Sequence, residues 1–342
     1  MQKIISTMLS LVLVCSLLVG TGCTFNSRID QPITITIWHV YGGQTDSPFN
    51  DLVENFNNTI GIEKGIRVEV TMVSDNKNSH DSIIAAAADD PGAAELPDIF
   101  IAYPKTVLAL PDQNILVDYR DYFTEEELQA FVPAFLEDGE IDGRLVCLPI
   151  AKSTEVLFIN KTDFDRFAAE TGVSIDDLKT WEGLFDVCRI YEEWTDSLTP
   201  EVENDGKAFF AHDYHFDYFQ VGVESLGESF FDGEDISFSP TFTRVWQPYA
   251  RAAIGGGLWL EDGYATGPLR TGEVIASVGS SASVLYYTNE VIRMDNTTET
   301  IEFDIMPCPI FADGENLVMQ RGAGICMVKS TPEKEQAAIC FL

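Results

Sequence analysis

His212, Asp213 and His215 are the residues whose types and spacing come closest to a reactive site. Imidazole and carboxylate groups of this kind hold metal ions, and His39 could complete the set. A carboxylate base at a defined helical offset is missing, and both histidines lie in the aromatic run HDYHFDYF. No GxSxG, P-loop or HExxH motif occurs. The pattern favours binding over catalysis, so no catalytic residue, metal or cofactor is expected, and a metal-dependent hydrolase is kept only as an alternative.

The segment 142–160, DGRLVCLPIAKSTEVLFIN, carries polar side chains between two apolar runs. Two strand-like runs without a real turn between them are typical of one extended segment that crosses between two bodies. Within the polar patch, Ser153 and Glu155 are two residues apart and therefore point to the same side of a strand. Because ligand clefts favour domain interfaces, we interpret the segment as a hinge beside a cleft. An ordinary strand pair inside one domain is the alternative.

The composition describes a globular protein with a strong excess of acidic residues. The chain has 342 residues, enough for about two domains. Its net charge of −34 argues against a nucleic-acid partner, because phosphates require patches of lysine and arginine. The same charge disfavours a polyanionic ligand unless a local cationic site exists.

Residues 1–22 have the pattern of a secretory signal, with Lys3 near the start and a mostly apolar run over 4–18. The run LLVGTGC resembles a bacterial lipoprotein signal with Cys23 as the lipidated residue, although Gly20 stands where Leu, Val or Ile is usual. The alternative is an ordinary signal peptide followed by a cysteine. Either pattern predicts an exported protein, in which 23–32 is the lipidated cysteine and a polar tether.

Five cysteines follow the tether: Cys147, Cys188, Cys308, Cys326 and Cys340. Their scattered positions fit no metal-binding spacing. Small buried thiols are expected, with a Cys308–Cys326 disulfide as the alternative.

Strand and helix patterns alternate in the first part of the sequence, which is typical of a parallel α/β arrangement. The expected strands are 33–38, 66–73 and 99–102, and the expected helices are 48–57 and 82–88. Farther on, helices are expected at 161–172, 176–191 and 243–254, strands at 271–278 and 303–306, and a further hinge crossing at 321–328.

An ordered set of sequence landmarks carries a family resemblance. The runs are ITITIWHVYGG, LPDIFIAYP, DGRLVCLPIAKSTEVLFINKTDF, LKTWEGLFDVC, GEVIASVGSSASVLYY, FDIMPCPI and RGAGICMVKSTPEKEQAAICFL. The sequence from 33 to 342 resembles the family 1, maltose-binding-like extracellular solute-binding proteins of bacterial ABC importers. The resemblance implies an α/β, two-lobed periplasmic-binding-protein-like fold of type II, with mainly parallel, helix-flanked sheets joined by hinge strands.

The resemblance also implies a function and partners. A receptor of this kind delivers a mono- or oligosaccharide to the permease subunits of an ABC transporter by closing its cleft. We expect a monomer, held at the outer face of the cytoplasmic membrane through Cys23, with no nucleic-acid partner. A sensory or adhesive surface receptor without transport is the alternative. Pro104 and the lack of a tyrosine in 76–80 do not support the glycerol-3-phosphate specificity of some relatives.

The lobes are expected at 33–149 plus 274–322 and at 150–273 plus 323–342. Family members run on for several more helices after the position of Leu342. By this comparison the second lobe is expected to be incomplete, with a truncation at its C-terminal end.

Residues that follow strands or match family positions form the candidate ligand site, because aromatic faces and polar groups together hold a sugar. Core packing or helix capping is the alternative for several of them. The candidates are Trp38, His39, Tyr41, Tyr103, Ser153, Glu155, Tyr214, Phe216, Ser280, Ser281, Arg321 and Gly322.

Overall fold

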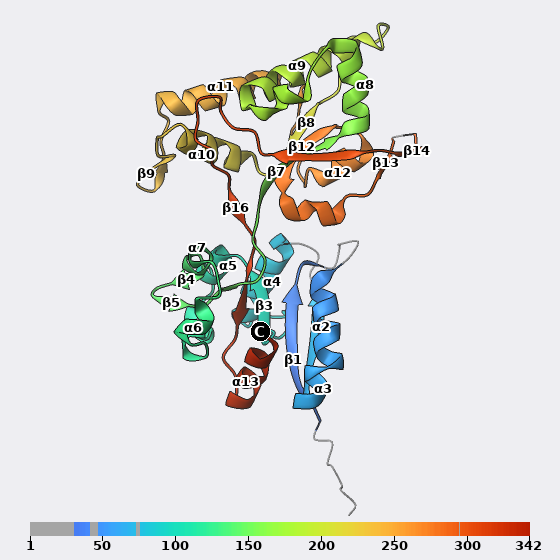
Figure 1. Ribbon diagram of the computed structural model, residues 1–342. Coiled ribbons are helices and arrows are strands. Elements are labelled where there is room, and N and C mark those ends of the chain that lie inside the picture. Colours follow the sequence, from blue (N-terminus) through green and yellow to red (C-terminus); the bar gives the residue numbers. More distant parts are fainter. Residues whose placement is uncertain (1–30, 42–46, 73–75, 294) are drawn as a thin grey trace, which may run out of the picture.

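The computed structural model describes residues 31–41, 47–72, 76–293 and 295–342. The expected leader, Cys23 and the tether up to residue 30 lie outside these residues. The described residues form two α/β lobes, one above the other in Figure 1, and strands from both ends of the sequence share the lower lobe. The two-lobed fold inferred from the sequence is confirmed.

A five-stranded sheet with the order β2-β1-β3-β17-β6 forms the first lobe. β1 is parallel to β2 and β3, whereas β17 is antiparallel to β3 and β6. These strands are β1 (Ile33–His39), β2 (Ile66–Met72), β3 (Ile99–Ala102), β6 (Leu148–Pro149) and β17 (Gly324–Met327), with a small hairpin of β4 (Glu140–Ile141) and β5 (Arg144–Leu145) beside them.

Helices bury apolar side chains on both faces of this sheet. Val53 and Phe56 of α2 belong to one apolar cluster with Ala337 and Ala338 of α13, and Ile83 of α4 belongs to another cluster. Pro48 starts α2 where a proline costs no helical hydrogen bond. The helices are α2 (Pro48–Asn58), α3 (Ile60–Lys64), α4 (Asn76–Ala87), α5 (Pro104–Leu108), α6 (Glu125–Leu128), α7 (Pro133–Glu137) and α13 (Pro332–Phe341), with 3-10 turns at Gln113–Ile115 and Tyr119–Asp121.

The second lobe contains a sheet with the order β11-β8-β12-β7-β15. β8 is parallel to β11 and β12, and β7 is antiparallel to β12 and β15. The strands are β7 (Ser153–Asn160), β8 (Phe210–His212), β11 (Leu258–Trp259), β12 (Ala276–Ser280) and β15 (Phe303–Pro307), with the hairpins β9 (Phe231–Asp232)–β10 (Asp235–Ile236) and β13 (Glu290–Ile292)–β14 (Thr298–Thr300).

Aromatic side chains dominate the core of the second lobe, where Trp181 packs against Phe185 and Tyr218. Thr180 caps α9 by accepting a hydrogen bond from the backbone N–H of Gly183 at 3.2 Å. The helices are α8 (Lys161–Thr171), α9 (Trp181–Ser197), α10 (His215–Ser225), α11 (Pro240–Ile254) and α12 (Thr266–Thr271), with 3-10 turns η4 (Ile175–Lys179) and η5 (Ser281–Tyr286).

The sheet pairings correct the expected lobe boundaries. β12 lies in the second lobe, because it hydrogen-bonds to β7 and β8, so the segment 274–322 does not return to the first lobe. β17 lies in the first lobe, because it pairs with β3 and β6, so the segment 323–342 does not belong to the second. Over the described residues, the backbone therefore crosses between the lobes twice, and the second lobe is one continuous insertion into the first.

The two crossings run side by side. β16 (Gln320–Arg321) is antiparallel to the start of β7, with Gln320 opposite Thr154 and Arg321 opposite Ser153. Figure 1 shows β7 rising from the lower lobe and β16 descending beside it. The hinge inferred for the segment 142–160 is thus a two-stranded connection.

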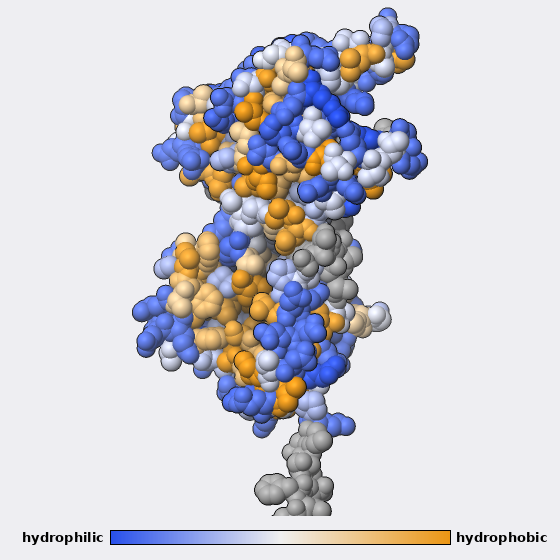
Figure 2. Space-filling model, turned by 45° about the vertical axis from the view of Figure 1, so that its right-hand side comes forward, coloured by the Kyte–Doolittle hydropathy of each residue, from blue (hydrophilic) through white to orange (hydrophobic). Residues whose placement is uncertain are grey.

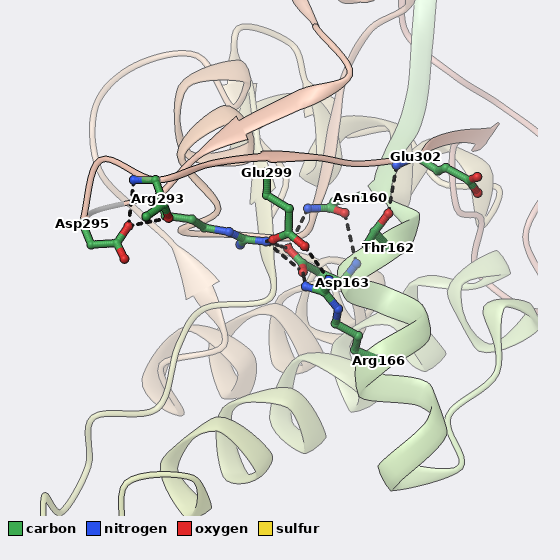
Figure 3. A network of polar contacts seen from close by, with 9 residues as sticks. Asn160, Thr162, Asp163, Arg166, Arg293, Asp295, Glu299 and Glu302 are labelled. Atoms are coloured by element: carbon green, nitrogen blue, oxygen red, sulfur yellow. Dashed lines mark hydrogen bonds and ion pairs between the residues drawn. The ribbon is translucent and has the colours of Figure 1, made fainter.

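A network of charged side chains fastens the β13–β14 hairpin to α8 (Figure 3). The guanidinium of Arg293 donates to Asp163 at 2.9 Å and to Glu299 at 2.6 Å. Arg166 binds the same two carboxylates from the α8 side. Hydrogen bonds from both arginines lower the pKa of Glu299 to about 2. The hairpin therefore gains a charged attachment in addition to its strand pairing.

No disulfide bond joins the cysteines among the described residues of this structure. Cys308 follows β15 in the second lobe and Cys326 belongs to β17 in the first, so the Cys308–Cys326 disulfide considered from the sequence is wrong. Both side chains are buried, as are those of Cys147 and Cys188, in agreement with the interpretation as buried thiols. Within the described residues, no helix is both long and apolar enough to cross a membrane.

Candidate functional site

A cavity of about 340 Å³ lies where the two lobes and the hinge meet. Figure 2 shows the lobes as two masses joined by a narrower waist. The first lobe contributes Val40, Tyr41 and Tyr103, from the segments that follow β1 and β3. The crossings contribute residues 151–153 and 321–323, and the second lobe contributes Asp213, Tyr214, Tyr264, Thr266, Ser280, Ala282, Ser283 and Tyr286.

Five tyrosines line this cavity and give it both flat apolar faces and hydroxyl groups: Tyr41, Tyr103, Tyr214, Tyr264 and Tyr286. The rings of Tyr214 and Tyr264 lie edge to face, with their centroids 6.5 Å apart. Burial raises the pKa of Tyr41 to about 12, and it also raises the pKa of Tyr103 and Tyr214. These hydroxyls therefore stay protonated and can donate as well as accept hydrogen bonds.

Arg321 is the central polar group of the cavity wall. Its Nη2 donates to Glu155 Oε1 at 2.6 Å and to Asp217 Oδ2 at 2.5 Å, and its guanidinium lies 4.2 Å from the ring centre of Tyr214. Among the described residues, its buried Nε has no hydrogen-bond partner. The charge of Arg321 is thus balanced by two carboxylates, and its Nε–H is a buried donor without a partner among the described residues.

Burial also changes the acidity of the carboxyl groups around Arg321. Burial raises the pKa of Glu155 to about 7, although the positive charge of Arg321 acts in the opposite direction. Burial likewise raises the pKa of Asp217 and of Asp213. The Asp213 carboxylate accepts from the backbone N–H of Ala265 at 2.8 Å, which fixes it at the cavity wall.

Hydroxyl groups hold the start of β7 against the second lobe, and the neighbouring Lys152 bonds to the first lobe. Ser153 Oγ lies 2.8 Å from Ser280 Oγ. Ser280 also caps η5 by accepting a hydrogen bond from the backbone N–H of Ala282. Ser280 is therefore a helix cap, as the alternative interpretation proposed, and it also lines the cavity. Ser281 accepts from the backbone N–H of Thr154 instead and does not line this cavity. Lys152 donates to Asp138 at 2.8 Å.

Seven of the twelve expected residues line the cavity: Tyr41, Tyr103, Ser153, Tyr214, Ser280, Arg321 and Gly322.

Trp38 and His39 are corrections to the expected site. Trp38 packs in the apolar core of the first lobe, because β1 is covered on both faces. His39 is fully buried and accepts a hydrogen bond from the backbone N–H of Tyr41 at 2.9 Å. His39 therefore shapes the turn that carries Tyr41 and does not itself face the cavity.

Glu155 and Phe216 also lie away from the cavity. Glu155 is 3% exposed and acts through its ion pair with Arg321. Phe216 packs edge to face on Phe230, with a centroid distance of 5.2 Å.

Sequence reasoning did not select Tyr264 and Tyr286 as ligand contacts. Tyr264 is a single aromatic residue in the polar stretch EDGYATG, and an isolated aromatic of this kind could have indicated a ligand contact. Tyr286 ends η5 and gave no such signal.

The histidines near the cavity have other partners than a metal ion. His212 Nδ1 accepts from the backbone N–H of Tyr214 at 3.1 Å, and His215 Nδ1 lies 3.0 Å from the hydroxyl of Tyr249. His39 lies in the other lobe. In the part of the protein that the structure describes, no three His, Cys, Asp or Glu side chains gather as a metal site would require.

Comparison with known proteins agrees with this architecture. A family model described as bacterial extracellular solute-binding protein matches residues 51–342. No match was found among curated protein sequences.

Several solved structures have the same fold. The cyclic α-maltosyl-1,6-maltose binding protein of Arthrobacter globiformis is 20% identical, with a TM-score of 0.62 over 91% of this chain and 74% of that one. UgpB of Mycobacterium tuberculosis, in complex with glycerophosphocholine, is 19% identical, with a TM-score of 0.67 over 90% and 73%. An ABC substrate-binding protein of Listeria monocytogenes, in complex with cycloalternan, is 16% identical, with a TM-score of 0.66 over 91% and 74%.

Proposed function

Because this chain belongs to the bacterial extracellular solute-binding proteins, we propose that it binds a neutral mono- or oligosaccharide in the cleft between its lobes. Closing of the lobes around the sugar then presents the loaded receptor to the permease subunits of an ABC importer. Its residues bind and do not react, so the sugar leaves the protein unchanged.

The observation that carries this proposal is the lining of the cleft by five tyrosines around a charge-balanced arginine. Tyrosine rings can cover the C–H faces of a sugar, and their hydroxyls can replace the water that sugar hydroxyls lose. Maltose, acarbose and cycloalternan are the ligands named for several proteins of the same fold, which supports the same ligand class here.

The charges around the cleft favour a neutral ligand over a phosphate. Arg321 is paired with Glu155 and Asp217, and Lys152 is paired with Asp138. Asp213 adds a further carboxyl at the cleft wall. A phosphate would have to displace these carboxylates from the two cations, which costs binding energy.

We further propose that the protein acts as a monomer on the outer face of the cytoplasmic membrane, anchored through a lipid on Cys23. The signal-like run LLVGTGC supports this anchoring, and the extracellular family supports export. Metabolic labelling with a radioactive fatty acid tests the anchor. Label in the protein is expected, and its persistence after Cys23→Ser would contradict the proposal.

Thermal unfolding in the presence of candidate ligands tests the proposed function. A ligand that binds only the folded protein raises the unfolding midpoint by mass action. We expect one class of mono- or oligosaccharide to raise it, and glycerol-3-phosphate, glycerophosphocholine, amino acids and zinc to leave it unchanged. A shift with glycerophosphocholine alone would replace the sugar by a phosphodiester, and a shift with zinc alone would replace it by a metal.

Variants of the tyrosines locate the site once a sugar is found. Tyr264→Ala removes a half-exposed aromatic from the cleft, and we expect a roughly fivefold weaker Kd, because one aromatic stacking contact is worth about 1 kcal/mol. Phe238→Ala is the matched control, since Phe238 is an exposed aromatic of the same lobe that does not line the cavity. Isothermal titration calorimetry measures both; equal affinities in the two variants would place the site elsewhere.

A further inference from the structure

Cys147 and Cys326 lie opposite each other in the first-lobe sheet. β17 pairs antiparallel with β6, with Gly324 opposite Pro149 and Ile325 opposite Leu148. The same register, continued by one residue, places Cys326 opposite Cys147. Both side chains are buried and belong to the same apolar cluster of the first lobe.

Gly324 makes room for the sulfur of Cys147. A Cβ atom on residue 324 would lie 2.5 Å from Cys147 Sγ, which is closer than any side chain allows. Residues 324 and 326 point to the same face of β17, because side chains alternate along a strand. The sulfur of Cys147 therefore lies on the face of β17 that carries the side chain of Cys326.

We propose that Cys147 and Cys326 are joined by a disulfide bond in the exported protein. The family is extracellular, and disulfides form and persist in oxidising compartments. Residues directly opposite on antiparallel strands have Cβ atoms about 4.5–5.5 Å apart, and a disulfide needs about 3.5–4.5 Å. A small approach of the two strands closes this difference.

The chemistry requires an external disulfide as oxidant, such as that of an oxidised dithiol protein or of a small thiol compound. Cys147 precedes Cys326 in the sequence, so its thiolate is the first to attack the external disulfide, forming a mixed disulfide and releasing one thiol.

Cys326 completes the exchange. Its thiolate attacks Cys147 Sγ, the new S–S bond forms, and the second thiol of the oxidant leaves. The two cysteines lose two protons and two electrons in total, and the oxidant gains them as two thiols. Both sulfurs are accessible to this exchange before β17 docks between β3 and β6, because docking then buries them.

The bond would join the two crossings at their first-lobe ends. Cys147 precedes β7, along which the chain leaves the first lobe, and Cys326 follows β16, along which the chain returns. The closed loop therefore contains the whole second lobe. Cross-links that close long loops restrict the unfolded chain most, so a measurable stabilisation is expected. The inference requires export but not the sugar specificity proposed above.

Peptide mapping of the exported full-length protein tests the bond directly. The protein is alkylated under denaturing conditions without reductant and then digested with trypsin. Cleavage after Arg144, Lys152, Arg321 and Lys329 releases the peptides 145–152 and 322–329, each with one cysteine. We expect them as one linked species, lighter by two hydrogens than the separate pair and resolved into two by reductant. Recovery of both peptides alkylated, or of either linked to another cysteine, would overturn the proposal.

Thermal unfolding with and without reductant gives a second readout. Reductant should lower the midpoint of the wild-type protein by roughly 5 °C or more and leave Cys147→Ser unchanged. Cys340→Ser is the control, since Cys340 lies on α13, and it should keep both the linked peptides and the reductant effect. Equal midpoints of the wild-type protein in the two conditions would contradict the bond.

Discussion

Arg321 brings a positive charge to the wall of the cleft, and Glu155 and Asp217 share that charge through one nitrogen. The three side chains come from β16, β7 and α10, so their ion pairs connect the returning crossing to the second lobe. These two ion pairs also hold the guanidinium of Arg321 over the ring of Tyr214. Glu155 thus acts on the cavity through Arg321, as a positioning residue that a ligand does not contact.

The raised pKa of Glu155 makes a prediction for stability against pH. The folded protein holds this proton up to a pH of about 7, whereas the unfolded chain releases it near 4.5. The folded state therefore binds more protons between these values, and the free energy of unfolding falls as the pH rises from about 4.5 to 7. This group alone accounts for about 3 kcal/mol.

Denaturant unfolding at pH 5 and pH 8 measures this contribution. Glu155→Gln cannot titrate, so the variant should lose about 3 kcal/mol less than the wild-type protein between the two conditions. Asp138→Asn serves as a control at an exposed carboxylate of the hinge region. Identical pH dependence in the wild-type protein and Glu155→Gln would show that Glu155 titrates normally.

At the scale of single elements, α9 depends on a close approach at its first turn. Thr180 caps the helix, and Gly183 lies so near η4 that a Cβ there would come within 2.1 Å of the backbone oxygen of Asp177. The turn and the helix are thereby packed together, and the buried face of α9 is aligned on the aromatic core. Gly267 of α12, in contrast, has open space around the position of a Cβ atom.

These two helical glycines predict effects of different size for the same substitution. Gly183→Ala should destabilise the protein by roughly 2 kcal/mol or more, because the backbone of η4 must move. Gly267→Ala should change the stability by less than about 1 kcal/mol, because the gain in helix propensity is opposed by contact of the new Cβ with the ring of Pro268. Differential scanning calorimetry compares them; a midpoint as low for Gly267→Ala as for Gly183→Ala would contradict this difference.

The sequence predicted the positions of helices and strands more accurately than the lobe to which each of them belongs. The expected helices at 48–57 and 243–254 correspond to α2 and α11, because amphipathic spacing and caps are local properties. The strand at 271–278 was assigned to the wrong sheet, because an apolar run does not specify its pairing partner. Trp38 was assigned to the cleft for a similar reason, since only the tertiary fold shows that a helix covers it.

On the scale of the whole molecule, the two paired crossings must bend when the lobes open and close around the cleft. Gly322 has a φ of +109°, and a Cβ there would lie 2.3 Å from the backbone oxygen of Ala151. The backbones at Gly322 and Ala151 are in contact, so a residue with a Cβ atom at position 322 would clash with the segment that leads into β7. The residue is thus required by the geometry of the hinge in addition to lining the cleft.

Substitution of Gly322 should therefore affect closure. With a bound sugar, small-angle X-ray scattering should show a smaller radius of gyration for the wild-type protein, and Gly322→Ala should lose this change together with affinity. Gly143→Ala is the matched control, because Gly143 also has a positive φ but open space around its Cβ position. It should lose about 1 kcal/mol of stability and still close. A closing response retained in Gly322→Ala would contradict this role.

The position of β17 has a consequence for how the protein is made. The strand lies inside the first-lobe sheet, between β3 and β6, yet it is encoded after the entire second lobe. During synthesis or translocation from the N-terminus, the inserted lobe can complete its core while the lobe that emerged first still waits for an inner strand. Such distant pairing slows folding. The first lobe therefore finishes its sheet last, because its inner strand emerges only behind the whole second lobe.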